Sequence, residues 1–255
     1  LDAYKNNLKG ACVFYEAPEE KTPDPTQKKS LYKIVYDPYR DDGGGTSLAS
    51  IIVYKGISEN NWAAGLQDDI VAEYIGRMDR VDDVHEIAVK LAVYYNAKIM
   101  VETNIADFIR YCKREGWTHL LQAKPIDAIA AAVKNPGKKY DVGIDMTSPA
   151  LQEQAEQLWR QWLLTEWKTL DSGVVLYNLN KLKSPMILKQ LIQYDKKGNY
   201  DHVSSLKLLA LWLAQEKRVP IQQSSEVAKE SLNTYFKKIT LLNKIVKKNY
   251  NYHNY

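Results

Sequence analysis

The chain has 255 residues, of which 35 are lysine or arginine and 31 are aspartate or glutamate. This length is enough to bury a substantial core, and a charged fraction of 26% argues against a disordered chain. The longest apolar run, Leu208 to Ala214, is too short to cross a bilayer, and two cysteines, Cys12 and Cys112, exclude a disulfide scaffold. Two such thiols are typical of a reducing, intracellular compartment, and a first residue of Leu rather than Met indicates a fragment of a longer protein.

Five short apolar segments rich in β-branched and aromatic residues predict strands. Residues 16–30, rich in proline and charge, predict a linker before the first of them. Three glycines within residues 41–47 predict the turn of a hairpin that joins the first two strands. The predicted strands are Leu31 to Asp37, Leu48 to Tyr54, Ile70 to Ile75, Ala97 to Val101 and His119 to Gln122.

Helical periodicity predicts helices between the later strands and through the second half of the chain. Strands that alternate with helices are typical of parallel crossover units. Ser148 and Pro149 predict the N-cap and first turn of one helix, and the helix that opens with Val203 is apolar nearly all round, so we expect it to be buried. The predicted helices cover residues 81–96, 104–115, 148–167, 185–194 and 203–215.

The predicted organisation has three parts: a lead-in strand and linker in 1–30, one α/β domain in 31–218, and a helical arm in 219–255. The arm carries six lysines against two glutamates, so the whole net charge of +4 lies in it and the rest of the chain is neutral. A basic arm suggests an anionic partner, with a solvated lysine face as the alternative. The apolar stripe of the arm predicts packing on its own domain or a contact with another subunit.

Three carboxylates stand at the ends of these predicted elements. Asp37 ends the first strand, Glu102 follows the strand 97–101, and Asp201 precedes the helix that opens with Val203. Ligands of open α/β sheets bind outside the carboxyl ends of parallel strands, and neighbouring strands are about 4.8 Å apart. If the two strands are neighbours, these acids form an oxygen-only site suited to Mg²⁺ or Mn²⁺. Taken singly, each acid is also explained as a turn former, a surface residue or a helix N-cap.

Other polar residues are weaker candidates for the same site. Lys138 and Lys139, beside a turn and a tyrosine, are suited to DNA phosphate contacts, and a generic exposed turn explains them equally well. Asp41 and Asp42 are candidates for outer acids of the metal site, although a plain hairpin turn is the favoured interpretation. For His202, which follows the third acid, we expect exposure to solvent rather than contact with a phosphate.

Three stretches, VYDPYRDDGGGTSLASIIVYKG, IMVETN and YDKKGNYDHVSSLKLLALWLA, resemble the C-terminal nuclease domain of the large terminase subunit of tailed bacteriophages. The resemblance extends over residues 1–217 and implies an α/β, RNase H-like mixed sheet flanked by helices, here with a C-terminal helical arm. It implies that Asp37, Glu102 and Asp201 are the catalytic and metal-binding residues, holding two Mg²⁺ or Mn²⁺ ions. Many members have a second acid where this chain has His202.

The function implied by this resemblance is metal-dependent cleavage of concatemeric double-stranded viral DNA during genome packaging, in the cytoplasm of the infected bacterial host. No GxxxxGK[ST] motif occurs, which predicts a nuclease part without its ATPase motor. The implied partners are double-stranded DNA, the terminase ATPase domain, the small terminase subunit and the portal, with no membrane. The alternatives are another RNase H-like nuclease, such as a junction resolvase, and a non-catalytic module that docks on the portal or DNA.

Overall fold

The computed structural model describes residues 8–19, 31–39, 47–57, 68–124, 141–196 and 198–217. It divides into two compact units, a larger one built from residues up to 159 together with 181–218, and a smaller one that contains residues 160–180. The predictions for the glycine-rich turn, for Lys138 and Lys139, and for the arm 219–255 lie outside the described residues. Among the described helices, none combines the length and the apolar character that a membrane span needs.

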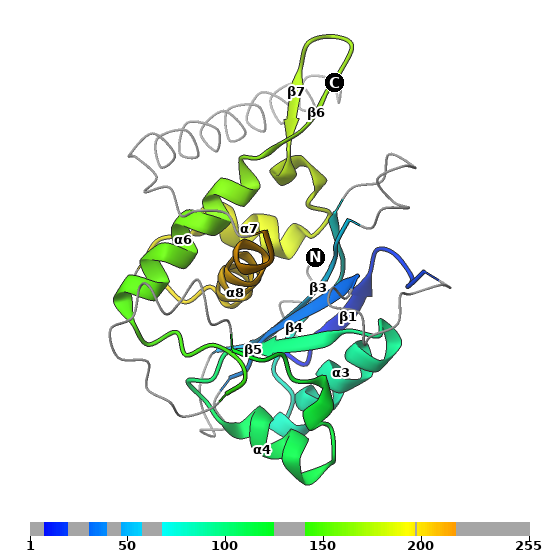
Figure 1. Ribbon diagram of the computed structural model, residues 1–255, viewed down its shortest axis with the longest axis vertical. Coiled ribbons are helices and arrows are strands. Elements are labelled where there is room, and N and C mark those ends of the chain that lie inside the picture. The colour runs from blue at the N-terminus through cyan, green and yellow to red at the C-terminus, as the bar shows by residue number, and fades with distance from the viewer. Residues whose placement is uncertain are drawn as a thin grey trace, which may run out of the picture. The chain divides into compact units, whose positions relative to one another are not determined.

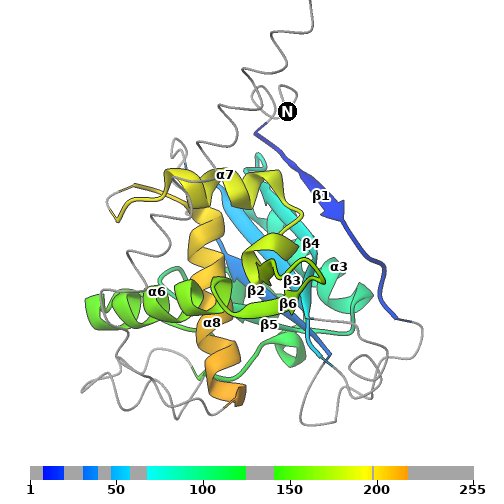
Figure 2. The same cartoon turned by 90° about the horizontal axis from the view of Figure 1, so that it is seen from above.

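The larger unit is built on a five-stranded mixed sheet in the order β1-β4-β3-β2-β5 (Figures 1 and 2). The first four strands in this order pair antiparallel, and β5 joins β2 in parallel. The predicted hairpin of the first two strands and the predicted α/β class are therefore confirmed. The strands are β1 (Ala11–Phe14), β2 (Tyr32–Asp37), β3 (Ala49–Lys55), β4 (Asp69–Gly76) and β5 (Lys98–Val101).

Helices cover both faces of this sheet, as Figures 1 and 2 show together. On one face lie α3 (Val81–Tyr94) and α4 (Asp107–Arg114), and on the other lie α7 (Pro185–Gln193) and α8 (Asp201–Lys217). The side chain of Ser184 caps α7 by accepting a hydrogen bond from the Ile187 amide at 3.0 Å. The remaining long helix, α6 (Pro149–Leu163), begins at the predicted proline.

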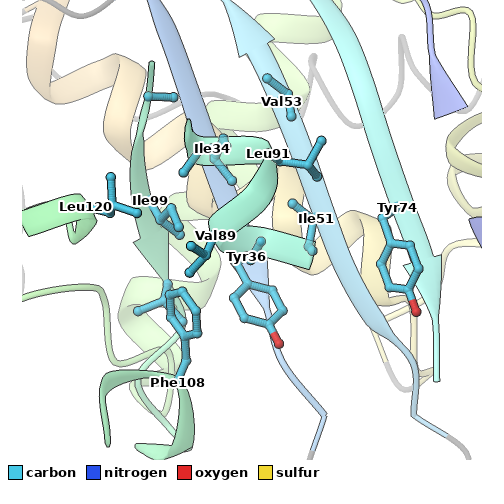
Figure 3. Packing of buried hydrophobic residues seen from close by; sticks show 14 of the residues in the cluster. Ile34, Tyr36, Ile51, Val53, Tyr74, Val89, Leu91, Ile99, Phe108 and Leu120 are labelled. Atoms are coloured by element: carbon cyan, nitrogen blue, oxygen red, sulfur yellow. The ribbon is translucent and has the colours of Figure 1, made fainter. Parts of the chain in front are cut away.

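The core explains why the central strands are apolar at nearly every position rather than at every second one. All residues of β3 are buried, because a sheet covered by helices on both faces has no solvent-facing side. On the α3 face, Ile34 and Ile51 meet Leu91, and Phe108 contacts the ring of Tyr36 edge-on at 5.0 Å (Figure 3). The predicted burial of α8 is confirmed, since its apolar residues lie under the other face.

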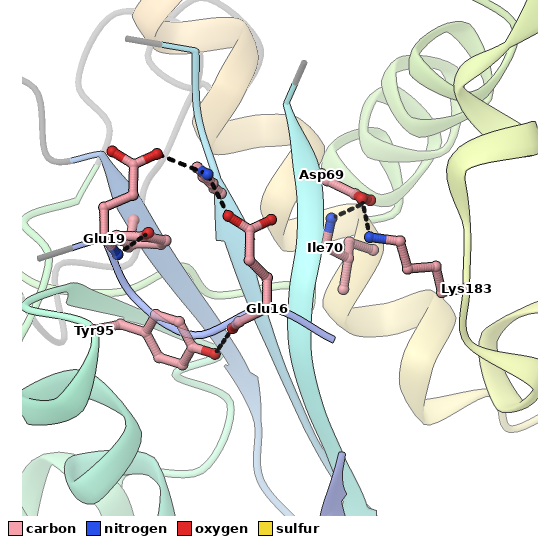
Figure 4. A network of polar contacts seen from close by, with 8 residues as sticks. Glu16, Glu19, Asp69, Ile70, Tyr95 and Lys183 are labelled. Atoms are coloured by element: carbon pink, nitrogen blue, oxygen red, sulfur yellow. Dashed lines mark hydrogen bonds and ion pairs between the residues drawn. The ribbon is translucent and has the colours of Figure 1, made fainter. Parts of the chain in front are cut away.

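Polar contacts fix one end of the sheet (Figure 4). The buried ammonium group of Lys55, at the end of β3, pairs with Glu16 and lies 2.8 Å from a carboxylate oxygen of Glu19. At the start of β4, Asp69 accepts a hydrogen bond from Lys183 at 2.6 Å. These ion pairs hold the segment after β1 against the end of β3, and the segment before α7 against the start of β4. Their role is therefore structural.

Two predicted elements are corrected by the structure. Residues 119–122 form no strand: a 3-10 turn, η1 (Thr118–Leu120), is followed by a single parallel bridge from Leu121 to Ile99. The predicted helix 148–167 ends at Leu163. The chain then forms a hairpin of β6 (Glu166–Thr169) and β7 (Val175–Tyr177), whose turn contains Gly173 at a φ of 78°. A short 3-10 helix, η2 (Asn178–Lys181), follows this hairpin.

Candidate metal centre at the ends of β2 and β5

Two of the predicted acids follow neighbouring parallel strands. Tyr36 is the register partner of Val101, and the Glu102 amide donates a hydrogen bond to the Tyr36 carbonyl at 2.9 Å. Asp37 and Glu102 therefore leave the sheet at the same edge. Side chains alternate along a strand, so both lie on the face opposite Tyr36 and Val101, which is the face covered by α8. The two strands are neighbours, which meets the condition under which the sequence places both acids in one site.

The third acid arrives from that helix. Asp201 is the first residue of α8, and its carboxylate is buried. It accepts a hydrogen bond from the Leu48 amide at 3.3 Å and another from the side chain of Asn199. The start of α8 thus faces the strand end at Asp37. The structure brings the three acids close enough for the charges of Glu102 and Asp201 both to act on Asp37.

The electrostatics of the site are those of crowded carboxylates. Burial, followed by the negative charges of Glu102 and Asp201, raises the pKa of Asp37 well above its usual range. Burial raises the pKa of Glu102 to about 7, and the Asp37 carboxyl donates a hydrogen bond to it. Burial also raises the pKa of Asp201, against the hydrogen bond from Leu48. The positive charge of Lys207 partly offsets this repulsion, because it lowers the pKa of Glu102.

The donor set fits a hard divalent cation in its chemistry. Asp37 and Glu102 supply carboxylate oxygens side by side, and they bound a cavity of about 160 Å³ together with Pro38 and Asn104. Asp201 does not line this cavity, although its charge acts on Asp37. Within the part of the chain that the structure describes, no group of three or more His, Cys, Asp or Glu side chains is spaced to hold a metal ion. Two carboxylates therefore form the nearer pair, with the third acid close by.

Asn104 belongs to the site, although the sequence pattern predicts it as the start of a helix. Its amide nitrogen donates a hydrogen bond to a carboxylate oxygen of Glu102, and its amide oxygen accepts one from the Met146 backbone at 2.9 Å. The backbone of Ile144 pairs in parallel with that of Glu102. Asn104 thus holds Glu102 against residues 144–146, a contact between segments far apart in sequence. In the sequence, the feature that points to this role of Asn104 is an amide side chain two residues after Glu102.

Ser204 and Lys207, on α8, also belong to the site and lie one and two turns after Asp201. The Ser204 hydroxyl donates a hydrogen bond to the carboxylate of Asp37. The charge of Lys207 acts on Glu102. Residues three apart are neighbours on the surface of a helix, and this spacing is the sequence signal that finds them once Asp201 is placed.

His202 is buried, so the predicted exposure is wrong. Its Nδ1 lies 2.7 Å from the Ser50 hydroxyl, and its Nε2 lies 3.7 Å from a carboxylate oxygen of Glu73. Burial lowers the pKa of His202 to about 3, so the ring is neutral. The physical reason is that α8 packs against the sheet, and the residue after Asp201 turns toward Ser50 of β3 and Glu73 of β4. His202 therefore does not replace the second acid of the resemblance.

Comparisons with known proteins identify no family for this chain. No protein-family model matches it, and a search of curated proteins returns no match. The predicted DNA contacts Lys138 and Lys139 and the predicted outer acids Asp41 and Asp42 lie outside the described residues. The geometry of the three acids and the short motifs around them are therefore the features that bear on function.

Proposed function

We propose that this chain is a metal-dependent endonuclease for double-stranded viral DNA, the nuclease part of a large terminase subunit. The observation that carries the proposal is the meeting of Asp37 and Glu102 at the ends of adjacent parallel strands, with Asp201 at the start of the facing helix. These are the acids of the YDP, VETN and YDHVSS motifs. The mixed sheet flanked by helices is compatible with the RNase H-like fold that the motifs imply.

In this proposal Asp37, Glu102 and Asp201 hold two Mg²⁺ or Mn²⁺ ions, which would supply activation of water and stabilisation of the leaving oxygen. Asp37 is the central acid of the three, because the charges of both other acids act on it. The rest of the chain orients these carboxylates through the hydrogen bonds from Ser204 to Asp37 and from Asn104 to Glu102. Partial burial keeps bulk water from competing for their oxygens.

The test is nicking of a supercoiled plasmid with Mg²⁺ or Mn²⁺. Asp37→Asn removes the charge and keeps the shape, so we expect nicking to disappear while circular dichroism and urea unfolding still report a folded protein. The matched control is Asp79→Asn, at an acid whose side chain is 79% exposed and which pairs with Lys9 at the surface. This control should nick at the wild-type rate. Wild-type nicking by Asp37→Asn would contradict the proposal.

Two further comparisons separate this proposal from its alternatives. A non-catalytic docking module nicks no plasmid with either metal, whereas a nuclease loses its nicking when a chelator is added. A junction resolvase prefers a four-way junction to linear duplex, whereas a packaging nuclease cuts linear duplex. In the packaging role, the proposed partners are the terminase ATPase domain, the small terminase subunit and the portal.

A further inference from the structure

A second cavity of about 170 Å³ opens directly beside the acids, and Glu102 is part of its wall. Its volume is below the range of about 300–1,000 Å³ that is typical of small-molecule sites, so it suits a group the size of a phosphate with its sugar. The wall is mostly polar and is formed by α8, the segment that precedes it, and Glu102, Met146 and Gln152. Besides Glu102, it contains Tyr194, Lys196, Asn199, Ser204 and Lys207.

The cavity carries positive charge next to the cluster of three acids. The Lys207 ammonium group lies 5.3 Å from the centre of the Tyr194 ring, which supports it by a cation–π contact. Lys196 stands at the rim and is 2.6 Å from Glu153. The charge of Lys207 also acts on Glu102, which links this lysine to the acids.

Helix geometry sets the distance from the acids to this lysine. Asp201, Ser204 and Lys207 follow one another at intervals of three residues along α8. Each residue rises about 1.5 Å, so Lys207 stands about 9 Å along the helix from Asp201. Phosphates of one DNA strand follow one another about every 3.4 Å along the duplex axis, so this reach corresponds to two or three successive phosphates.

We infer that this cavity holds the DNA backbone next to the cleaved bond, with Lys207 as its main phosphate contact and Lys196 as a second contact at the rim. The inference rests on the proposed function and specifies how the substrate is held. Without metal ions the three carboxylates repel a polyanion, and residues 1–218 have no net charge to attract one. A lysine within the same cavity as Glu102 offsets that repulsion at the point where the strand enters.

The test measures binding without cleavage. A fluorescein-labelled duplex oligonucleotide is titrated with the chain in the presence of a chelator, and anisotropy is followed at a series of salt concentrations starting from low salt. We expect Lys207→Gln to weaken binding about tenfold and to reduce the slope of log K against log salt by about 0.9, the value for one lost phosphate contact. Lys207→Arg, which keeps the charge, should retain the wild-type slope.

The matched control is Lys90→Gln on α3, on the opposite face of the sheet, where the lysine is exposed and pairs with Glu86. It should bind with wild-type affinity and slope. Lys196→Gln decides the matter if Lys207→Gln does not fold, because Lys196 lies on a surface segment and should lower the slope in the same direction. Wild-type slopes in the variants that fold, or no binding by the wild-type chain at low salt, would overturn the inference.

The outcomes also separate this inference from the proposed function. If Lys207→Gln lowers the affinity and the slope but the wild-type chain nicks no plasmid with either metal, the cavity binds DNA and the proposed function fails. If the wild-type chain nicks plasmid and Lys207→Gln binds and nicks equally well, the proposed function stands and the phosphate contact is wrong.

Discussion

Replacing Glu102 by glutamine should stabilise the metal-free protein and, at the same time, abolish its proposed cleavage. Glu102 lies beside Asp37, and burial raises its pKa from 4.5 to about 7. Below pH 4.5 the side chain is protonated in the folded and the unfolded protein, and its contribution to stability is fully present. As the pH rises to about 7, the unfolded chain ionises first, so that contribution is lost.

The size of this loss follows from the pKa. The difference between 4.5 and about 7, at about 1.36 kcal/mol for each pH unit, corresponds to ~3 kcal/mol of unfolding free energy. Glutamine has nearly the same shape and never ionises, so Glu102→Gln should recover most of this free energy above pH 7 and little of it below pH 4.5. The figure is an upper value, because glutamine accepts a weaker hydrogen bond from Asp37.

The assay is urea unfolding in the presence of a chelator, at about pH 8 and about pH 4.5, with midpoints compared at a constant m-value. The matched control is Glu86→Gln on α3, where the carboxylate is exposed and pairs with Lys90, and its unfolding free energy should change by less than about 0.5 kcal/mol. A Glu102→Gln variant that is less stable than the wild type at the higher pH would refute the reasoning. So would an equal gain at both pH values, since that gain would not come from ionisation.

Two further predictions concern the scaffold of the site. Gly143→Ala should destabilise the protein by about 1–3 kcal/mol in urea unfolding and reduce plasmid nicking, because Gly143 has a φ of 67° and an added Cβ would lie 2.4 Å from the Val101 carbonyl oxygen. Equal stability and nicking would show that residues 143–146 do not position Glu102. Ile34→Ala in the core should cost about 2–5 kcal/mol, whereas Ile192→Ala, at a residue that is 51% exposed, should cost less than about 0.5 kcal/mol. Similar costs for both would contradict the assigned core.

Local patterns predicted the central sheet well. The strands that became β2, β3 and β4 were predicted within one or two residues, because their β-branched and aromatic residues and the turn signals around them act locally. The same reasoning failed for the hairpin of β6 and β7. Helical periodicity continues past Leu163, and the hairpin exists because Thr169 pairs with Val175 across a turn that no periodicity reveals.

The acids of the candidate site could be predicted from the sequence, whereas the residues that support them could not. Asp37 and Glu102 follow recognisable strands, so their common edge followed from the rule for parallel neighbours. The prediction that His202 is exposed was wrong. A helix that is apolar nearly all round has no polar face, so its sequence does not show which side of it turns toward the sheet. Asn104 contacts Glu102 only because residues 144–146 return to the same edge of the sheet.

The sequence by itself determined the α/β class, the antiparallel hairpin of the first two strands and the three acids at the ends of elements, since each depends on residues close together in the chain. Only the tertiary structure decided that Asp37 and Glu102 share a hydrogen bond, that Ser204 and Lys207 face them, and that His202 is enclosed. The last two features depend on how α8 is rotated about its own axis against the sheet. That rotation is set by packing between distant segments, which no local pattern encodes.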